Sequence, residues 1–158
     1  MGFDLEAFLG RGAEMRGWTR ELPSAVVCGL SGELGMVPLT GRLLRDLAAR
    51  LDAAEKFRTY PSPSMREGVR RWGARASRGT AVAHVSTGEF GDTSYETAML
   101  WVDGELVLPA TGLREALAYL RDTAGIRFDT SAIDLEIHRG EDAAEKWAAA
   151  APRLPPMR

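Results

Sequence analysis

The chain has 158 residues, 45% of them hydrophobic and 27% charged, and its net charge is −2 at pH 7. This length suits one domain that can bury a core without a metal ion or a disulfide. The composition is ordinary for a globular protein, and the small net charge favours no class of partner by itself.

Several features of the sequence predict a cytoplasmic protein that is not attached to a membrane. The single cysteine, Cys28, cannot form an internal disulfide, and its apolar neighbours favour a buried, inert thiol. No apolar run approaches the ~20 residues that span a bilayer. Asp4 and Glu6 occupy the region where a secretory signal would be basic.

The first elements are expected to be a helix and two short strands. Residues 4–22 predict a helix, interrupted by glycines, because Leu5, Phe8 and Leu9 recur at helical spacing. The apolar run of residues 25–30 is typical of a buried strand, and residues 34–38 predict a second one.

Two helices should follow in the middle of the chain. The first begins after Thr40, a suitable N-cap, and carries leucines at helical spacing: Leu43, Leu44, Leu47 and Leu51. The second begins at Ser64, because Ser64 and Glu67 have the spacing of a capping box.

From Gly79 the apolar period changes from helical to twofold. Residues 80–87, 94–102 and 105–108 therefore predict a three-stranded β-meander, with a hairpin loop over residues 88–92. Asp103-Gly104 is a strong signal for the second turn, because both central positions of such a turn favour positive φ. Pro109 is expected to end the last strand.

Two further helices are expected, over residues 111–124 with Thr111 as the cap, and over residues 141–151. The whole chain then predicts one α+β domain over residues 1–151, followed by a flexible tail over residues 152–158. Its sheet should be mainly antiparallel, with four to five strands including the meander, packed with three to four helices.

The predicted hairpin loop carries the first candidate site, Glu89-Phe90-Gly91-Asp92. An exposed Phe90 would anchor a protein partner, while Glu89, Asp92 and Glu96 would attract basic groups. A Phe90 that folds back onto the core would leave only a turn. The residues do not decide between these interpretations.

His84, on the first strand of the meander, suggests an alternative in which the protein is a small enzyme. Glu89, Asp92 or Glu96 would approach His84 across the hairpin and form an acid–base set with it. A hydrogen-bonded structural histidine is the simpler interpretation. The chain contains two histidines, too few for a zinc site, so we predict no metal ion and no cofactor.

The helix over residues 64–78 suggests a third interpretation, a nucleic-acid-associated protein. Residues 56–78 have a local charge of +6, and four arginines share the outer face of the helix: Arg66, Arg70, Arg71 and Arg75. The acidic pI of about 5.8 disfavours this interpretation. A charged outer face of a helix also usually serves solvation.

Residues 83–120 resemble a group of small bacterial proteins that includes immunity-type proteins, which neutralise polymorphic toxins. The resemblance lies in Phe90-Gly91-Asp92, in Trp101-Val102-Asp103-Gly104, in Pro109 and in the helix that follows. It implies a non-enzymatic interaction module that binds and occludes a toxin domain through surface acids and aromatic residues. We take this as the leading hypothesis, ahead of the enzyme and the nucleic-acid-associated protein.

Overall fold

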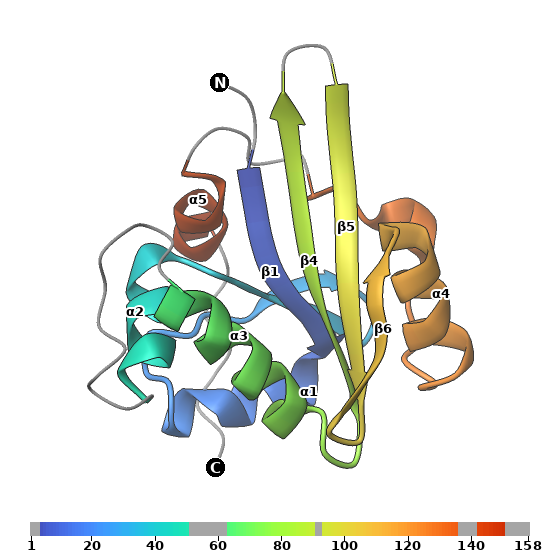
Figure 1. The fold of residues 1–158 in the computed structure, drawn as a ribbon. Coiled ribbons are helices and arrows are strands. Elements are labelled where there is room, and N and C mark those ends of the chain that lie inside the picture. The colour runs from blue at the N-terminus through green and yellow to red at the C-terminus, as the bar shows by residue number, and fades with distance from the viewer. Residues whose placement is uncertain (1–3, 51–62, 91–92, 136–141, 151–158) are drawn as a thin grey trace.

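The computed structural model describes residues 4–50, 63–90, 93–135 and 142–150. Six antiparallel strands form one sheet in the order β2-β3-β1-β4-β5-β6, and helices pack against it (Figure 1). The α+β class is confirmed, with more strands than expected. The strands are β1 Asp4–Arg11, β2 Cys28–Ser31, β3 Leu34–Pro38, β4 Ala81–Phe90, β5 Thr93–Val102 and β6 Glu105–Thr111.

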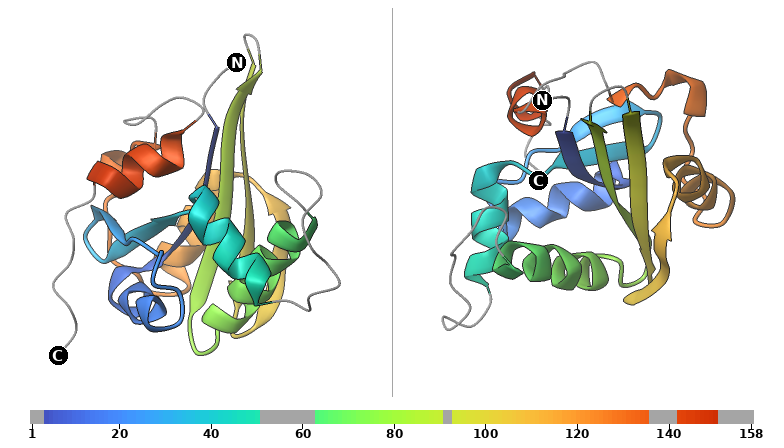
Figure 2. Two further views of the ribbon diagram at one scale, coloured as in Figure 1. Left: turned by 90° about the vertical axis from the view of Figure 1, so that its left-hand side faces the viewer. Right: turned by 45° about the horizontal axis from the view of Figure 1, so that its top comes forward.

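The described helices are three-residue to fourteen-residue segments placed on both sides of this sheet (Figures 1 and 2). None of them is long and apolar enough to span a bilayer. They are α1 Gly12–Met15, η1 Arg16–Arg20, α2 Gly41–Ala49, α3 Pro63–Ala76, α4 Leu113–Asp122, η3 Thr130–Ala132 and α5 Ala143–Ala150.

The sheet separates two hydrophobic cores. On one face, α4 and α5 bury a cluster that includes Leu5, Val85 and Leu100. On the other face, η1, α2 and α3 bury a cluster that includes Phe8 and Trp101. Successive residues of a strand point to opposite faces, so the central strands contribute to both clusters.

The prediction of a helix at the start of the chain is wrong, because residues 4–11 form strand β1. Strand β1 lies between β3 and β4 and is buried on both faces. A strand of this kind needs apolar residues on both sides and loses the twofold alternation that identifies a strand. Leu5, Phe8 and Leu9 then happen to match helical spacing.

The meander is confirmed as three sequential antiparallel strands, β4, β5 and β6. Asp103 and Gly104 both adopt positive φ, 49° and 85°, as the predicted tight turn requires. The expectation that Pro109 ends the last strand is wrong, since β6 continues to Thr111. An edge strand tolerates proline because one side of its backbone needs no donor for the sheet.

The other elements lie close to their predicted positions. Thr40 caps α2 as expected, its hydroxyl oxygen accepting from the Leu43 amide at 3.1 Å. Strand β2 begins at Cys28 instead of residue 25, and α4 begins after Gly112 without a side-chain cap, so Thr111 is not the cap. The predicted tail, residues 152–158, lies outside the described residues.

We predict that Leu117→Ala destabilises the fold by about 2–5 kcal/mol, because it leaves a cavity in the core beneath α4. Leu117 is 4% exposed, whereas Leu106 is 47% exposed, so Leu106→Ala is the matched control. Urea unfolding of both variants measures the difference. A loss below about 1 kcal/mol for Leu117→Ala would show that this residue is not packed as described.

Candidate functional site

The hairpin formed by β4 and β5 projects beyond the rest of the sheet (Figure 1). Among the described residues, strand β1 pairs with β4 as far as Gly88, and β6 pairs with β5 as far as Ala98. The two strands continue from there as a ribbon of their own, in which Glu89 pairs with Ser94 and Phe90 with Thr93. The side chains of Glu89 and Phe90, and Asp92 altogether, lie outside the described residues.

The described part of the hairpin does not bring His84 and Glu96 together. His84 pairs with Met99, while Glu96 pairs with Thr87. Since paired residues share a face of the sheet, strand alternation places His84 and Glu96 on opposite faces. Glu96 is exposed, and the acid–base set predicted from these two residues does not form.

His84 is buried against the core beneath α2 and α3. Its ring meets Phe8 edge to face, with 5.9 Å between the ring centroids. The side chain is 9% exposed, and burial lowers its pKa to about 4, so the imidazole is neutral at pH 7. Its Nε2 has no hydrogen-bond partner among the described residues, which differs from the expected hydrogen-bonded structural histidine.

His84 lines a hollow of about 190 Å³ between the sheet and the two helices. Apolar and polar side chains contribute equally to its wall, and two arginines of α3 line it from the helix side. Its lining residues are Glu6, Leu44, Met65, Arg66, Val69, Arg70, His84 and Met99. The sequence did not indicate this hollow, because its residues come from five elements spread over more than half of the chain.

The arginines of α3 are exposed, as the sequence predicted. Arg70 and Arg71 both form ion pairs with Glu67, at 3.9 and 3.0 Å. Arg75 pairs with Glu21 at 2.9 Å, as Arg50 does at 2.8 Å.

Arg50 and Arg75 also lie over the ring of Trp72, with their guanidinium carbons 5.2 and 5.8 Å from its centroid. Carboxylates therefore already engage three of the four predicted arginines, the exception among the described contacts being Arg66. Such pairing leaves a weaker attraction for a phosphate backbone.

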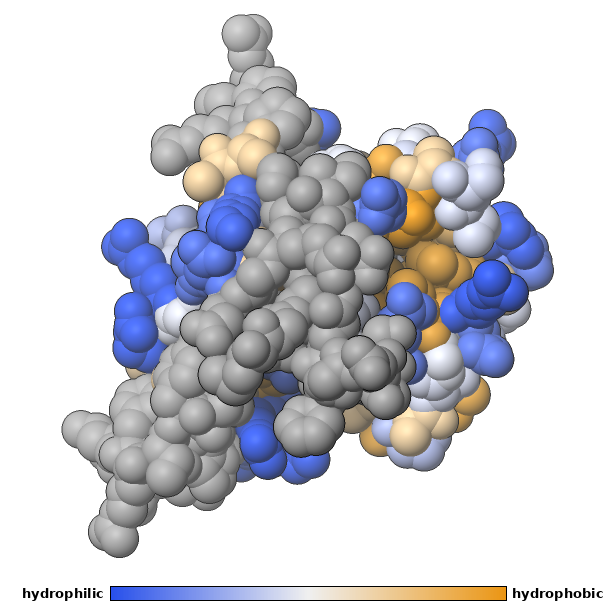
Figure 3. Space-filling model, turned by 90° about the horizontal axis from the view of Figure 1, so that it is seen from above, coloured by the Kyte–Doolittle hydropathy of each residue, from blue (hydrophilic) through white to orange (hydrophobic). Residues whose placement is uncertain are grey.

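The outer edge of the meander is apolar and open. Leu106 and Val107 on β6 are 47% and 40% exposed, and they are the large exposed hydrophobic residues of the described chain. Viewed from above, apolar surface is visible on the side of the molecule that carries α4 (Figure 3). The run Leu106-Val107-Leu108 is the available sequence signal, but such a run is also typical of an ordinary meander strand.

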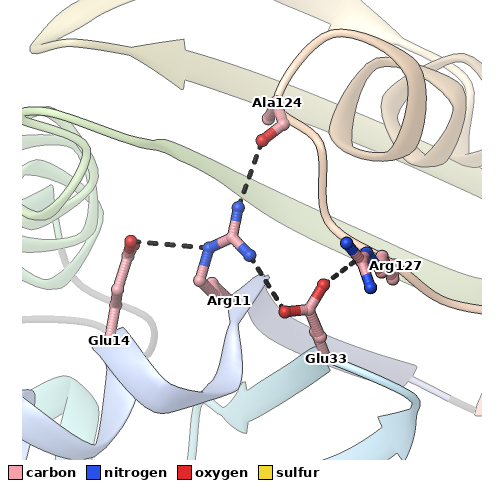
Figure 4. Close-up of polar contacts among 5 residues, drawn as sticks. All are labelled: Arg11, Glu14, Glu33, Ala124 and Arg127. Carbon is pink, nitrogen blue, oxygen red and sulfur yellow. Dashed lines mark hydrogen bonds and ion pairs between the residues drawn. The ribbon is translucent and has the colours of Figure 1, made fainter.

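A network of polar contacts surrounds Arg11 at the end of β1 (Figure 4). Arg11, at the end of β1, contacts Glu14, Glu33 and the carbonyl oxygen of Ala124. Glu33 in turn accepts from the Arg127 amide at 2.9 Å. These partners are all internal, so the network joins the end of β1 and the turn between β2 and β3 to the segment after α4.

Cys28 is buried, and burial raises the pKa of its thiol to about 11. A protonated thiol is a poor nucleophile and metal ligand. Within the described residues, no three His, Cys, Asp or Glu side chains gather as a metal site.

Comparisons with protein-family models, with curated proteins and with solved structures found no match to this chain.

We predict that His84 makes the protein lose stability as the pH falls from about 6.5 to about 4. Below pH 6.5 the unfolded chain protonates this histidine, but the buried native ring stays neutral until about pH 4. The shift corresponds to roughly 3 kcal/mol that favours unfolding at the acidic end.

The variant His84→Gln carries no such proton and provides the comparison. Urea unfolding at several pH values should show the free energy of unfolding of the wild type falling relative to the variant over this window. Parallel curves would show that the native His84 ring is protonated as easily as in the unfolded chain. His138 and the carboxylates are common to both proteins and cancel.

Proposed function

We propose that the protein is a non-enzymatic interaction module that binds a basic partner protein along the outer edge of the meander. We define this acidic edge by β6 and by the stretch of β5 beyond it, up to the hairpin. The specific form that we propose is an immunity-type protein that occludes a bacterial toxin. The exposed apolar pair Leu106 and Val107, set in an acidic strand environment, carries the proposal.

The backbone of the acidic edge supports binding by strand addition. Strand β6 pairs with β5 on one side, and no described strand lies on its other side. An extended segment of a partner would hydrogen-bond to such an edge, and its side chains would contact Leu106 and Val107. The register shifts in β6 and its Pro109 restrict this pairing and so limit uncontrolled aggregation.

The charge of the meander indicates which partner fits. Residues 79–113 contain five acidic residues and neither lysine nor arginine: Glu89, Asp92, Glu96, Asp103 and Glu105. Two copies of this edge would repel each other, since like charges on paired strands destabilise the pairing. A basic segment would instead be attracted during approach and held in place once bound.

The hairpin extends the same surface. In this proposal Glu89, Phe90, Asp92 and Glu96 form its distal part, with Phe90 as an apolar anchor and the acids around it. The alternative of a small enzyme has less support, because His84 and Glu96 lie on opposite faces of the sheet. The nucleic-acid alternative has less support because Glu21 and Glu67 already pair with the α3 arginines.

We expect Leu106→Asp with Val107→Asp to weaken partner binding by about 2 kcal/mol or more while the melting temperature stays close to that of the wild type. The matched control, Ala149→Asp with Ala150→Asp, adds the same charge to exposed positions of α5. The partner is sought by pull-down from the native host and among the products of neighbouring reading frames, and affinity is then measured by calorimetry.

For the immunity-type form, co-expression should protect cells from the partner with the wild type and the control, but not with the edge variant. A partner that binds all three proteins equally would place the interface elsewhere. An acidic partner would contradict the electrostatic part of the proposal.

We expect Phe90→Ala to weaken binding of the same partner by roughly 2 kcal/mol, mainly through faster dissociation, with little change in stability. Surface plasmon resonance and a thermal melt of this variant separate the two effects. A destabilised fold with unchanged affinity would remove the hairpin from the interface and assign Phe90 to the core.

A further inference from the structure

The hollow beside His84 has features of a ligand site that the proposed protein interface does not use. It lies beneath α2 and α3, on the face of the sheet that carries Phe8 and Trp101, whereas the acidic edge follows β6. Its volume of about 190 Å³ is below the ~300–1,000 Å³ of sites for drug-sized ligands, so an occupant has only a few carbon atoms.

His84, one of the residues that line this hollow, has a polar atom without a partner among the described residues. His84 is more than nine-tenths buried, and its Nε2 makes no hydrogen bond within the described chain. A buried polar atom without a partner costs about 1–3 kcal/mol, so native proteins rarely leave one unsatisfied. This atom has almost no accessible surface, so a ligand oxygen in the hollow supplies the missing hydrogen bond only after a local movement of the ring or its neighbours.

The charges around the hollow select an anion. Arg66 and Arg70 line it from successive turns of α3, and both are exposed. Arg66 makes no ion pair with a described residue, and Arg70 has only the long 3.9 Å contact with Glu67. A guanidinium group binds a carboxylate through two parallel N–H bonds, which favours a planar anionic group.

Glu6 is the acidic residue of the lining, and it is engaged in an interaction of its own within the chain. Its carboxylate disfavours an anionic group on the β1 side, so the anion belongs on the α3 side, near the arginines. The remaining wall, from Leu44, Val69 and Met99, is apolar and suits a hydrocarbon body.

We propose that this hollow binds a small aliphatic monocarboxylate, with its carboxylate between Arg66, Arg70 and the His84 ring and its hydrocarbon chain against the apolar wall. A bare inorganic anion would leave the apolar wall uncovered, and a neutral molecule would give Arg66 no ionic partner and Arg70 none closer than Glu67.

A second hollow, next to Trp72, is a weaker candidate. Its arginines are Arg50, Arg71 and Arg75, and each already pairs with Glu21 or Glu67. A ligand anion would have to displace those carboxylates, whereas at the hollow beside His84 only the long 3.9 Å contact between Arg70 and Glu67 competes with it.

The test titrates the full-length protein with hexanoate and follows the imidazole resonances of its two histidines by NMR. His84→Gln assigns them, and His138 serves as an internal reference. We expect saturable shifts of the His84 signals. We also expect the midpoint of His84 protonation to rise toward its ordinary value when hexanoate is bound, because a nearby anion favours the imidazolium.

Three further probes identify what is recognised. Hexanol has the same chain without the charge, hexylamine carries the opposite charge, and inorganic phosphate has no apolar body. The proposal expects hexanoate to bind at least about tenfold more tightly than each of them, since a charged hydrogen bond is worth that much. Equal binding of any of these three would overturn it.

The variant Arg66→Gln with Arg70→Gln should weaken hexanoate binding by about tenfold or more, because it removes both charges at the α3 side. Arg78→Gln is the matched control, since Arg78 is exposed and does not line the hollow. All these positions are on the surface, so the fold is expected to persist, and a thermal melt confirms it. Undiminished binding by the double variant, or no saturable binding by the wild type, would contradict the proposal.

Discussion

Strand β1 must be apolar on both sides because it occupies the middle of a sheet that has helices on both faces. It joins the β2–β3 pair to the meander, so the sheet would be two separate fragments without it. Ala7, Phe8 and Leu9 are all fully buried there, each on the face opposite to its neighbour. Sheets covered on both faces generally require such continuous apolar strands.

The close approach of the backbones where β1 and β3 pair also explains a glycine near the start of β3. A Cβ atom on Gly35 would lie 2.8 Å from the Cα atom of Gly12, so the two backbones cross at a distance that permits no side chain. The Gly12 amide donates to the Glu33 carbonyl at 2.9 Å in the same place. Gly12, one of the glycines that suggested an interrupted helix, instead lies where β1 turns directly into α1. The crossing excludes a side chain at Gly35, whereas a Cβ atom on Gly12 would make only ordinary contacts.

The sequence predicted those elements whose pattern is local and one-sided. Strands β4 and β5 alternate, Asp103-Gly104 marks their second turn, and the leucines of α2 form one stripe after Thr40. The prediction failed for β1, which is buried on both faces. Such a strand lacks the alternating polar residues that distinguish a strand from a helix. The prediction also misjudged Pro109, because the position of β6 at the edge depends on the order of strands in the sheet.

The candidate sites were less predictable than the fold for the same reason. His84 was identified, but its proposed carboxylate partner Glu96 is on the other face, a consequence of register that residue spacing alone did not reveal. The hollow beside His84 requires β1, α2, α3, β4 and β5 to meet, and such long-range assembly has no short sequence signature. Leu106 and Val107 are likewise exposed because β6 is at the edge of the sheet, with no described strand on its outer side.

The small net charge conceals an asymmetry in how the charges are used. The basic residues of α3 are mostly engaged within the chain, through Glu21 and Glu67, and Arg75 also lies over the ring of Trp72. Glu96 and Glu105, by contrast, make no ion pair with any described residue and are exposed. Unpaired surface charges act on approaching molecules more strongly than paired ones, because an internal partner cancels the field at a distance. The acidic edge that we propose as an interface therefore keeps charges that can act on a basic partner, whereas three of the four α3 arginines are engaged by carboxylates within the chain.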